Sequence, residues 1–232
     1  MLNTFFDHIF CLNLARRQDR ALWTRDHCSR LGILYELFPA VDGHLLRDIH
    51  TRLKFPGTTG NLGATLSHLQ IFQTALARGY KNILVIEDDL VYHRDLPKLF
   101  ELLQLQIPAD WEMLYFAWIP VDYAHDTWDY TIIHDTFISP NIFKARSLWS
   151  AMAYGITASV MREIVASYEK SFVMEIDRYF VEKIQPTRKV YATWPQLFAG
   201  KDDLSDCNDK GMVVPVFQRS HDPRITRDTD FF

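Results

Sequence analysis

The chain has 232 residues, a formal charge of −4 from 25 Lys and Arg against 29 Asp and Glu, and 48% hydrophobic residues. Such a chain can bury its own core, which excludes a disordered tail, a collagen-like rod and a disulfide-stapled miniprotein. Its slight acidity also argues against nucleic acid as the main partner, because phosphate backbones require a concentrated basic face. We therefore expect a single domain over 1–232.

The cysteines Cys11, Cys28 and Cys207 are odd in number and far apart, and no Cys-x-x-Cys pair or Cys/His cluster accompanies them. This pattern favours a reducing compartment over a zinc site or a redox pair. Cys11 lies in an apolar run and is predicted to be a small buried hydrophobe. Because there is no basic leader and no apolar stretch of membrane-spanning length, we expect a cytoplasmic protein, peripheral to the inner membrane at most.

The first 80 residues alternate between strand and helix signals. An apolar run at 9–13 predicts a strand, and the Arg-rich stretch 17–31, stopped by Gly32, predicts a helix. A second strand is predicted at 34–41, before a Gly- and Pro-rich loop at 42–60. The clearest helix follows and stops at Gly79, since one apolar stripe is formed by Leu62, Leu66, Leu69, Phe72 and Leu76.

The same alternation continues to the end of the chain. The run 82–86 is apolar and branched after Asn82, with no polar alternation, as expected for a strand covered on both faces of a parallel sheet. Further strands are predicted at 113–117, 151–157 and 189–193, helices at 96–105 and 159–168, and a polar tail at 207–232. The aromatic segment from Trp118 to Tyr130 is long for a connection, so we place an acceptor-side loop at 118–145. The pattern predicts an α/β fold with a largely parallel sheet.

Three acids, Glu87, Asp88 and Asp89, directly follow the strand predicted at 82–86. In an extended chain Glu87 and Asp89 point to one face while Asp88 points away. Two convergent carboxylates suit Mg²⁺ or Mn²⁺ with substrate phosphates, and open α/β sheets bind ligands at the carboxyl ends of strands. Adjacent acids also cap helices or face water, and spacing alone does not separate these interpretations. The buried strand favours function.

Short motifs follow one another in order from residue 12 to residue 206. They are Leu12-Asn13-Leu14-Ala15-Arg16-Arg17-Gln18-Asp19-Arg20, Phe38-Pro39-Ala40-Val41-Asp42-Gly43, Gly63-Ala64-Thr65-Leu66-Ser67-His68, Ile86-Glu87-Asp88-Asp89-Leu90, Ala153-Tyr154-Gly155-Ile156-Thr157, Ile176-Asp177, and Pro195-Gln196-Leu197 through Ser205-Asp206. This set resembles glycosyltransferase family 25, the lipopolysaccharide and procollagen galactosyltransferase relatives. The chain departs from the pattern at Cys207, where the family usually has Ile. We also expect no signal peptide or retention tail of the kind that the collagen-modifying members carry, which favours the bacterial surface-glycan branch.

The resemblance implies a GT-A fold of the Rossmann-like kind, a nucleotide-sugar donor that is usually a UDP-hexose, and an inverting reaction. Glu87 and Asp89 then hold Mn²⁺ or Mg²⁺, and Asp88 takes part in donor binding. His221 is a candidate third metal ligand of the kind seen near the end of some GT-A enzymes. The alternative for this tail is a frayed, solvated terminus.

The acid of the late motif, Asp177, is the candidate general base, and Glu175 is the alternative two positions earlier. Asp177 also suits a helix N-cap, since Asp is among the best capping residues. Asn13 could bond the base or ribose of the donor, although a strand can also simply end at Asn.

Further polar residues each have a functional and a structural interpretation. Arg16, Arg17 and Arg20 could hold a diphosphate near a helix N-terminus, although exposed helical arginines are commonly solvated. The family match selects Arg17 and Arg20. Ser67 and His68 lie beside the leucine stripe, where a polar pocket could include them, and the family motif makes His68 a site residue.

Together these expectations give metal-assisted transfer of galactose or glucose from a UDP-sugar to a hydroxyl of a lipopolysaccharide-type or lipid-linked glycan. Two alternatives stay open. A metal phosphohydrolase would need further closely spaced Asp and His ligands, which the sequence lacks. A catalytically inactive glycan-binding or assembly protein with the same fold would not need to keep Glu87, Asp89 and Asp177.

Overall fold

The computed structural model describes residues 2–122, 127–172, 174–201, 203–204, 206–207, 213–214 and 231. Its helical elements are α1 (Leu2–Phe5), α2 (Gln18–Leu31), the 3₁₀ turn η1 (Gly43–Leu45), α3 (Arg47–Leu53), α4 (Thr59–Ala77), α5 (Leu96–Leu103), the 3₁₀ segment η2 (Tyr130–Thr136), α6 (Ala158–Lys170), α7 (Ile176–Tyr179) and the π-helical segment η3 (Phe180–Ile184). Its strands are β1 (His8–Asn13), β2 (Glu36–Pro39), β3 (Asn82–Glu87), β4 (Leu90–Tyr92), β5 (Met113–Asp122), β6 (Thr127–Trp128), β7 (Phe137–Ser139), β8 (Ile142–Lys144), β9 (Leu148–Thr157), β10 (Val190–Thr193), β11 (Phe198–Gly200), β12 (Asp203–Leu204) and β13 (Val213–Val214). None of the described helices combines the length and the apolar character that a membrane crossing requires.

Within the described residues, the main sheet has nine strands in the order β2-β1-β3-β9-β5-β10-β8-β7, with β6 paired to β5. β1 is parallel to β2 and β3, and β5 is parallel to β10. β9 lies antiparallel between β3 and β5, so β2, β1, β3, β5 and β10 all run in one direction. The predicted α/β fold with a largely parallel sheet is confirmed. The reversed direction of β9 could not be predicted from its apolar sequence.

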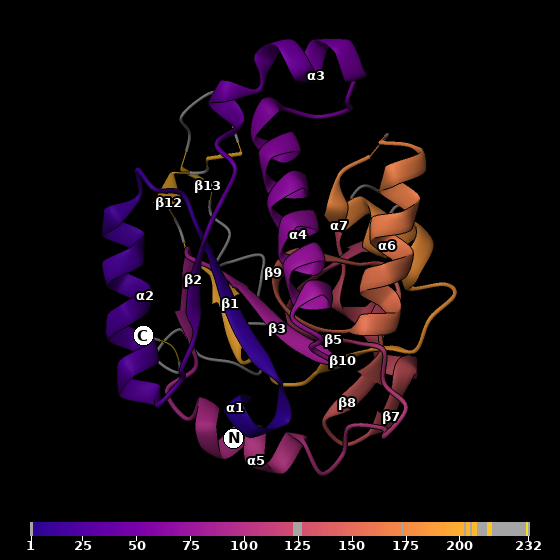
Figure 1. Ribbon diagram of the computed structural model, residues 1–232. Helices are drawn as coiled ribbons and strands as arrows, with labels where there is room; N and C mark the ends of the chain where they lie inside the picture. Colours follow the sequence, from indigo (N-terminus) through magenta and orange to yellow (C-terminus); the bar gives the residue numbers. More distant parts are fainter. Residues whose placement is uncertain are drawn as a thin grey trace.

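Helices cover both faces of this sheet, as Figure 1 shows. Side chains along β1 alternate between two cores: Phe10 and Leu12 pack in the core that α4 and α6 share, whereas Ile9 and Cys11 pack in the core that α2 and α5 share. β3 alternates in the same way. The prediction of a strand covered on both faces is therefore confirmed, as is the burial of Cys11.

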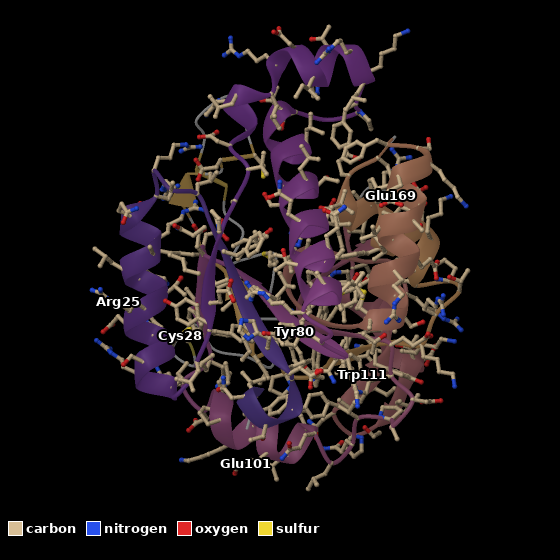
Figure 2. The ribbon with its side chains drawn as sticks, in the orientation of Figure 1. Arg25, Cys28, Tyr80, Glu101, Trp111 and Glu169 are labelled. Atoms are coloured by element: carbon tan, nitrogen blue, oxygen red, sulfur yellow. The ribbon has the colours of Figure 1, made fainter. Side chains whose placement is uncertain are left out.

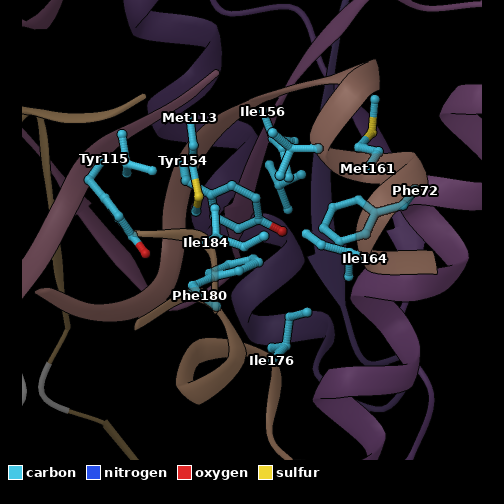
Figure 3. Close-up of a cluster of buried hydrophobic side chains, with 14 of the residues drawn as sticks. Phe72, Met113, Tyr115, Tyr154, Ile156, Met161, Ile164, Ile176, Phe180 and Ile184 are labelled. Atoms are coloured by element: carbon cyan, nitrogen blue, oxygen red, sulfur yellow. The ribbon is translucent and has the colours of Figure 1, made fainter. Parts of the chain in front are cut away.

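The core under α4 and α6 is built around aromatic and branched side chains. Figure 3 shows Tyr154 and Ile156 of β9 surrounded by Phe72 of α4, Ile164 of α6 and Phe180 of η3. On the outside, charged side chains such as those labelled on α2, α5 and α6 in Figure 2 point away from the sheet. The polar and apolar faces of these helices thus fix how each one lies against the sheet.

Helix α4 has clear start and stop signals. Thr58 and Asn61 form a capping box, in which the Thr58 hydroxyl accepts from the Asn61 backbone amide at 3.1 Å and the Asn61 side chain accepts from the Thr58 amide at 2.9 Å. After the helix, Gly79 has a φ of +76°, which glycine adopts without strain. The predicted helix is confirmed and begins at Thr59, before the first leucine of the stripe.

Two predicted connections differ from the structure. The segment 42–60, predicted to be a loop, contains η1 and α3. Helix α3 has no buried residue and is flanked by turn residues, so the sequence contains no stripe of buried apolar residues that would predict it. The strand predicted at 113–117 continues to Asp122. Trp118 therefore lies inside β5, fully buried, with its indole N–H donating to the Thr193 carbonyl at 3.1 Å and its ring stacked on Trp194. The prediction that Trp118 stacks on a sugar acceptor is wrong, because the core encloses it. Tyr123 lies outside the described residues.

Candidate active site

The three acids of the sequence lie where β3 ends beside β1. Leu12 and Glu87 are register partners in these parallel strands, and β3 is buried from Ile83 to Ile86. Asp88 and Asp89 both lie against one nitrogen of Arg20, with Nη1 at 3.1 and 3.0 Å from their carboxylates. The chain bends after Glu87, so the prediction that Asp88 points directly away from Asp89 is wrong.

Asp88 is the buried member of the three acids and is held from two sides. The Asn13 amide donates to Asp88 Oδ2 at 2.6 Å and to the Arg17 carbonyl at 3.0 Å, while Arg20 contacts Asp88 Oδ1. Burial raises the pKa of Asp88, and the charge of Arg20 and the hydrogen bond from Asn13 act against that rise. The Asn13 amide nitrogen, predicted to contact the donor nucleotide, thus joins the ends of β1 and β3.

The arginines that follow β1 are paired with carboxylates. Arg16 Nη1 and Arg17 Nη1 lie 2.6 and 2.7 Å from the two oxygens of Asp206, and Arg20 Nη1 lies 3.5 Å from it. Arg17 also contacts Asp19 at 2.9 Å. The structure brings Arg17 and Arg20 together at Asp206, whose carboxylate lies where the sequence predicted a diphosphate.

A first cleft of about 600 Å³ opens beside this arginine cluster. Its lining comes from the end of β1, the turn after β2, the start of α4 and the acids after β3: Leu12, Leu14, Arg16, Arg20, Ala40, Val41, Asp42, Gly43, Gly60, Ala64, Ser67, Glu87, Asp88, Asp89, Asp206 and Cys207. Glycine is needed where the backbones meet, because a Cβ on Gly60 would lie 2.6 Å from the Asp206 carbonyl oxygen. The cleft therefore lies at the carboxyl ends of the parallel strands, where such sheets bind ligands.

A second cleft of about 930 Å³ lies on the other side of Glu87 and Asp89. It shares Ala64, Glu87, Asp89 and Cys207 with the first cleft, and Asp88 does not belong to its lining. Its other lining residues are Asn61, Thr65, His68, Ile119, Trp149, Ser150, Ala151, Met152, Glu175, Ile176, Asp177, Gly200 and Lys201. Glu87 and Asp89 thus face a common cleft, and they form the wall between two adjoining spaces.

The late acids Glu175 and Asp177 line the second cleft together with Glu87. Glu175 is the N-cap residue of α7 and Asp177 lies in its first turn, so the alternative that Asp177 caps the helix is wrong. Burial raises the pKa of Asp177 to about 6, and the charges of Glu87 and Glu175 add to that rise, whereas the Arg178 amide, which donates to Asp177 Oδ1 at 3.0 Å, lowers it. Glu175 Oε2 is buried with no hydrogen-bond partner among the described residues. The second cleft therefore contains a carboxyl group that ionises near neutral pH.

His68 and Ser67 are buried on α4, although both adjoin a cleft. Nδ1 of His68 lies 2.7 Å from the Tyr154 hydroxyl, and Nε2 lies 3.5 Å from Glu87 Oε1. His68 thus lies between a core tyrosine and a carboxylate of the shared wall. The Ser67 hydroxyl donates to the Gly63 carbonyl and accepts from the Val41 amide, so it fixes the turn that lines the first cleft.

Glu87 and Asp89 of the shared wall offer carboxylate oxygens, the donor atoms that hard divalent cations prefer. Burial raises the pKa of Asp89 to about 7, the charge of Glu87 acts in the same direction, and Arg20 opposes it. Positive charge near Glu87 and Asp89 would relieve this repulsion, so the pair fits Mn²⁺ or Mg²⁺. The described part of the chain contains no group of three or more His, Cys, Asp or Glu side chains arranged to hold a metal ion. The predicted third ligand, His221, lies outside the described residues.

Several lining residues were not selected from the sequence. Asp206 and Cys207 reach the site from near the end of the chain, and the Cys207 carbonyl accepts from the Thr58 hydroxyl at 2.6 Å. Trp149, half-buried in β9, lines the second cleft beside Ser150, whose φ of +152° is unusual for a residue with a side chain. Only the aromatic character of Trp149 could have suggested it, because an apolar strand gives no sign of which residues border a cleft.

The chain is similar in sequence to known proteins. The family model described as Glycosyltransferase family 25 (LPS biosynthesis protein) matches residues 6–180. Human procollagen galactosyltransferase 2 is 28% identical over 216 residues, covering 75% of this chain and 32% of the relative. A glycosyltransferase 25 family member from Anopheles gambiae is 26% identical over 195 residues, covering 74% of this chain and 31% of the relative. The human protein named inactive glycosyltransferase 25 family member 3 is 26% identical over 198 residues, covering 75% of this chain and 31% of the relative.

The chain spans only about a fifth to a third of the length of such relatives. Among solved structures, a mannose-1-phosphate geranyltransferase from Thermus thermophilus aligns with a TM-score of 0.35 and 11% identity, covering 79% of this chain and 58% of that chain. That similarity is too low to support a conclusion about function.

Proposed function

Since the chain belongs to glycosyltransferase family 25, whose model matches residues 6–180, we propose that it transfers a sugar from a nucleotide-sugar donor to a hydroxyl group of a glycan. One observation carries this proposal: two clefts adjoin at a wall that includes Glu87 and Asp89, and Asp177 lines the second cleft. Two substrates that react at one bond need two adjoining spaces with acids where they meet. This arrangement favours transfer over binding alone.

The first cleft is proposed to hold the donor, a UDP-hexose with galactose or glucose. It lies at the carboxyl ends of β1 and β3, and Arg16 and Arg20 line it. A diphosphate there would compete with Asp206 for the arginine side chains, because both present oxygens to the same nitrogens. The name of the human relative, a procollagen galactosyltransferase, supports galactose as the first sugar to test.

The second cleft is proposed to hold the acceptor. In the reaction, Asp177 takes the proton from the acceptor hydroxyl as the hydroxyl oxygen bonds to C1 of the sugar. As that bond forms, the bond from C1 to the diphosphate oxygen breaks, and UDP leaves. The family resemblance implies inversion at C1, which requires attack from the side opposite the diphosphate. Attack from the second cleft on a donor in the first cleft is proposed to meet this requirement. A pKa of about 6 suits a base that works near neutral pH.

The remaining groups are proposed to support these steps. Glu87 and Asp89 would hold a divalent cation, which supplies positive charge to the departing diphosphate. Trp149 offers a half-buried indole in the acceptor cleft, where Trp118 was expected. The acceptor is proposed to be a lipopolysaccharide-type glycan, in keeping with the description of the family model. A cytoplasmic location stays a prediction.

The test is to incubate the protein with UDP-galactose or UDP-glucose, Mn²⁺ and a lipopolysaccharide-type acceptor, and to measure released UDP and sugar on the acceptor. We expect equal amounts of both products. Release of inorganic phosphate without sugar transfer would indicate a phosphohydrolase. If neither donor gives any product but the protein still binds the acceptor, the chain would be an inactive member of the family, as the name of one human relative describes that relative.

A further inference from the structure

An exposed apolar stripe runs along η1 and α3, next to the turn that lines the first cleft. Leu45, Ile49 and Leu53 follow one another at intervals of four residues and are 84%, 38% and 42% exposed. Ile49 and Leu53 share one face of α3, because residues spaced by four are neighbours on a helix, and Leu45 lies in η1 just before it. No residue of α3 is buried. Figure 1 shows α3 projecting beyond the end of α4, and Figure 2 shows its side chains pointing outward.

This helix is nevertheless anchored from below. Leu46 and Phe55, at either end of α3, pack with Leu62 of α4 in a small core of their own. His50 Nε2 lies 3.0 Å from the Gly57 carbonyl oxygen, which ties the middle of α3 to the loop before α4. These contacts fix the position of α3 on the fold, so the exposure of the stripe follows from the fold.

The exposed segment that contains the stripe has a net positive charge, on a chain that is negative as a whole. Residues 44–54 contain Arg47, Arg52 and Lys54 against the single acid Asp48, whereas the complete chain has a formal charge of −4. A short exposed segment with an apolar stripe and an excess of basic residues matches the interface of a bilayer that contains anionic lipids. A neutral glycan or an acidic sugar in solution would not need three exposed aliphatic side chains in a row.

The position of the stripe also orients the active site. Asp42 and Gly43, just before Leu45, line the first cleft, and α3 lies at the same end of the molecule as the carboxyl ends of β1 and β3. We propose that Leu45 and helix α3 form a membrane-docking surface that binds anionic lipid bilayers and turns the two clefts toward the membrane. Docking requires no donor or acceptor, so it stands or falls separately from the proposed sugar transfer.

The experiment is cosedimentation of the full chain with two kinds of vesicle, one of phosphatidylcholine alone and one that also contains about 30% phosphatidylglycerol to give an anionic surface. The test variant is Leu45→Ser/Ile49→Ser/Leu53→Ser. A matched control, Leu34→Ser/Leu102→Ser/Leu105→Ser, removes three leucines that are 76%, 62% and 81% exposed elsewhere. A third variant, Arg47→Gln/Arg52→Gln, removes charge alone. Every altered side chain is exposed, so each variant should fold, and melting curves check this.

We expect the wild-type chain and the control to bind anionic vesicles, and binding to fall in 1 M salt because charges are then screened within roughly 3 Å. The apolar variant should bind at least about tenfold more weakly, and the charge variant about fivefold more weakly for each arginine removed. Equal binding by the wild type and the apolar variant would overturn the proposal. So would failure of the wild type to bind anionic vesicles, and dimerisation through the stripe in the absence of lipid would instead identify a second copy as its partner.

Discussion

Replacing Arg20 with Met tests the charge network behind the active site. The Arg20 side chain is 7% exposed and lies 3.1 and 3.0 Å from the carboxylates of Asp88 and Asp89. Met keeps much of the aliphatic volume but leaves both acids without their shared cation. Breaking a buried ion pair on one side typically costs about 3–5 kcal/mol, because an uncompensated charge stays buried. That is a large part of the roughly 5–15 kcal/mol that stabilises a typical domain.

The assay is urea unfolding at constant ionic strength, followed by circular dichroism. The matched control is Arg30→Met, which breaks an exposed pair with Asp26 on the same helix, with side chains 59% and 51% exposed. The control should lose no more than about 0.5 kcal/mol. If the slope of the unfolding free energy against urea concentration is the same in both variants as in the wild type, the substitutions have changed stability and not the surface exposed on unfolding.

The loss in Arg20→Met should also depend on pH. Burial raises the pKa of Asp88 and of Asp89, the latter to about 7, and Arg20 opposes both rises. An acid whose folded-state pKa exceeds its unfolded value binds more protons when folded, so its contribution to stability falls as pH rises between about 4 and 7. Without Arg20 the folded-state pKa values rise further, so this fall continues to higher pH, and the variant should be closer to wild type at pH 5 than at pH 8. Equal losses for Arg20→Met and Arg30→Met, or a loss that does not change with pH, would refute the network.

Three further predictions concern the clefts. Sugar transfer should rise with pH through about 6 and level off above about 7, because Asp177 must be deprotonated to act as a base and the charges of Glu87 and Glu175 help to raise its pKa; released UDP measured from pH 5 to 8 checks this. Tyr154→Phe should lower stability by about 1 kcal/mol and lower turnover without changing KM for the donor, because His68 loses its partner at Nδ1; steady-state kinetics and melting curves would show it, and normal turnover would make the pair purely structural. UDP with Mn²⁺, at about a hundred times its dissociation constant, should stabilise the fold by roughly 2.7 kcal/mol, and UDP alone much less. Equal melting shifts with and without Mn²⁺ would exclude the metal from donor binding.

The fold could be predicted where the residue pattern is set by burial on a single element. The strand at 82–86 has one apolar residue after another from Ile83 because cores cover both its faces. The stripe of α4 predicted a helix, and Leu62, Leu69 and Phe72 of that stripe are buried. Helix α3 left no such pattern, because its apolar residues face outward and its ends carry turn residues. The direction of β9 was also hidden, since a strand buried on both faces has the same composition whichever way it runs.

The candidate site divides along the same line. Glu87, Asp89, His68 and Asp177 lie in ordered motifs, so the sequence named them as a set that the structure brings to one cleft. The contact between Arg17 and Asp206 spans 189 positions, and no local pattern reports a contact between residues so far apart. For the same reason the sequence predicted that Arg17 and Arg20 bind a diphosphate, whereas in the structure the carboxylate of Asp206 lies against them.

The most direct test of the central claim, that a carboxylate in the second cleft takes the acceptor proton, is the turnover of Asp177→Asn. Asn keeps an oxygen that can accept from the Arg178 amide, and Asp177 is not the capping residue of α7, so folding and UDP binding should stay close to wild type. Sugar transfer should fall by roughly 10²–10⁴-fold, the usual range for a positioned general base. Near-normal transfer by Asp177→Asn, with a large loss in Glu175→Gln, would contradict the assignment and move the base to Glu175.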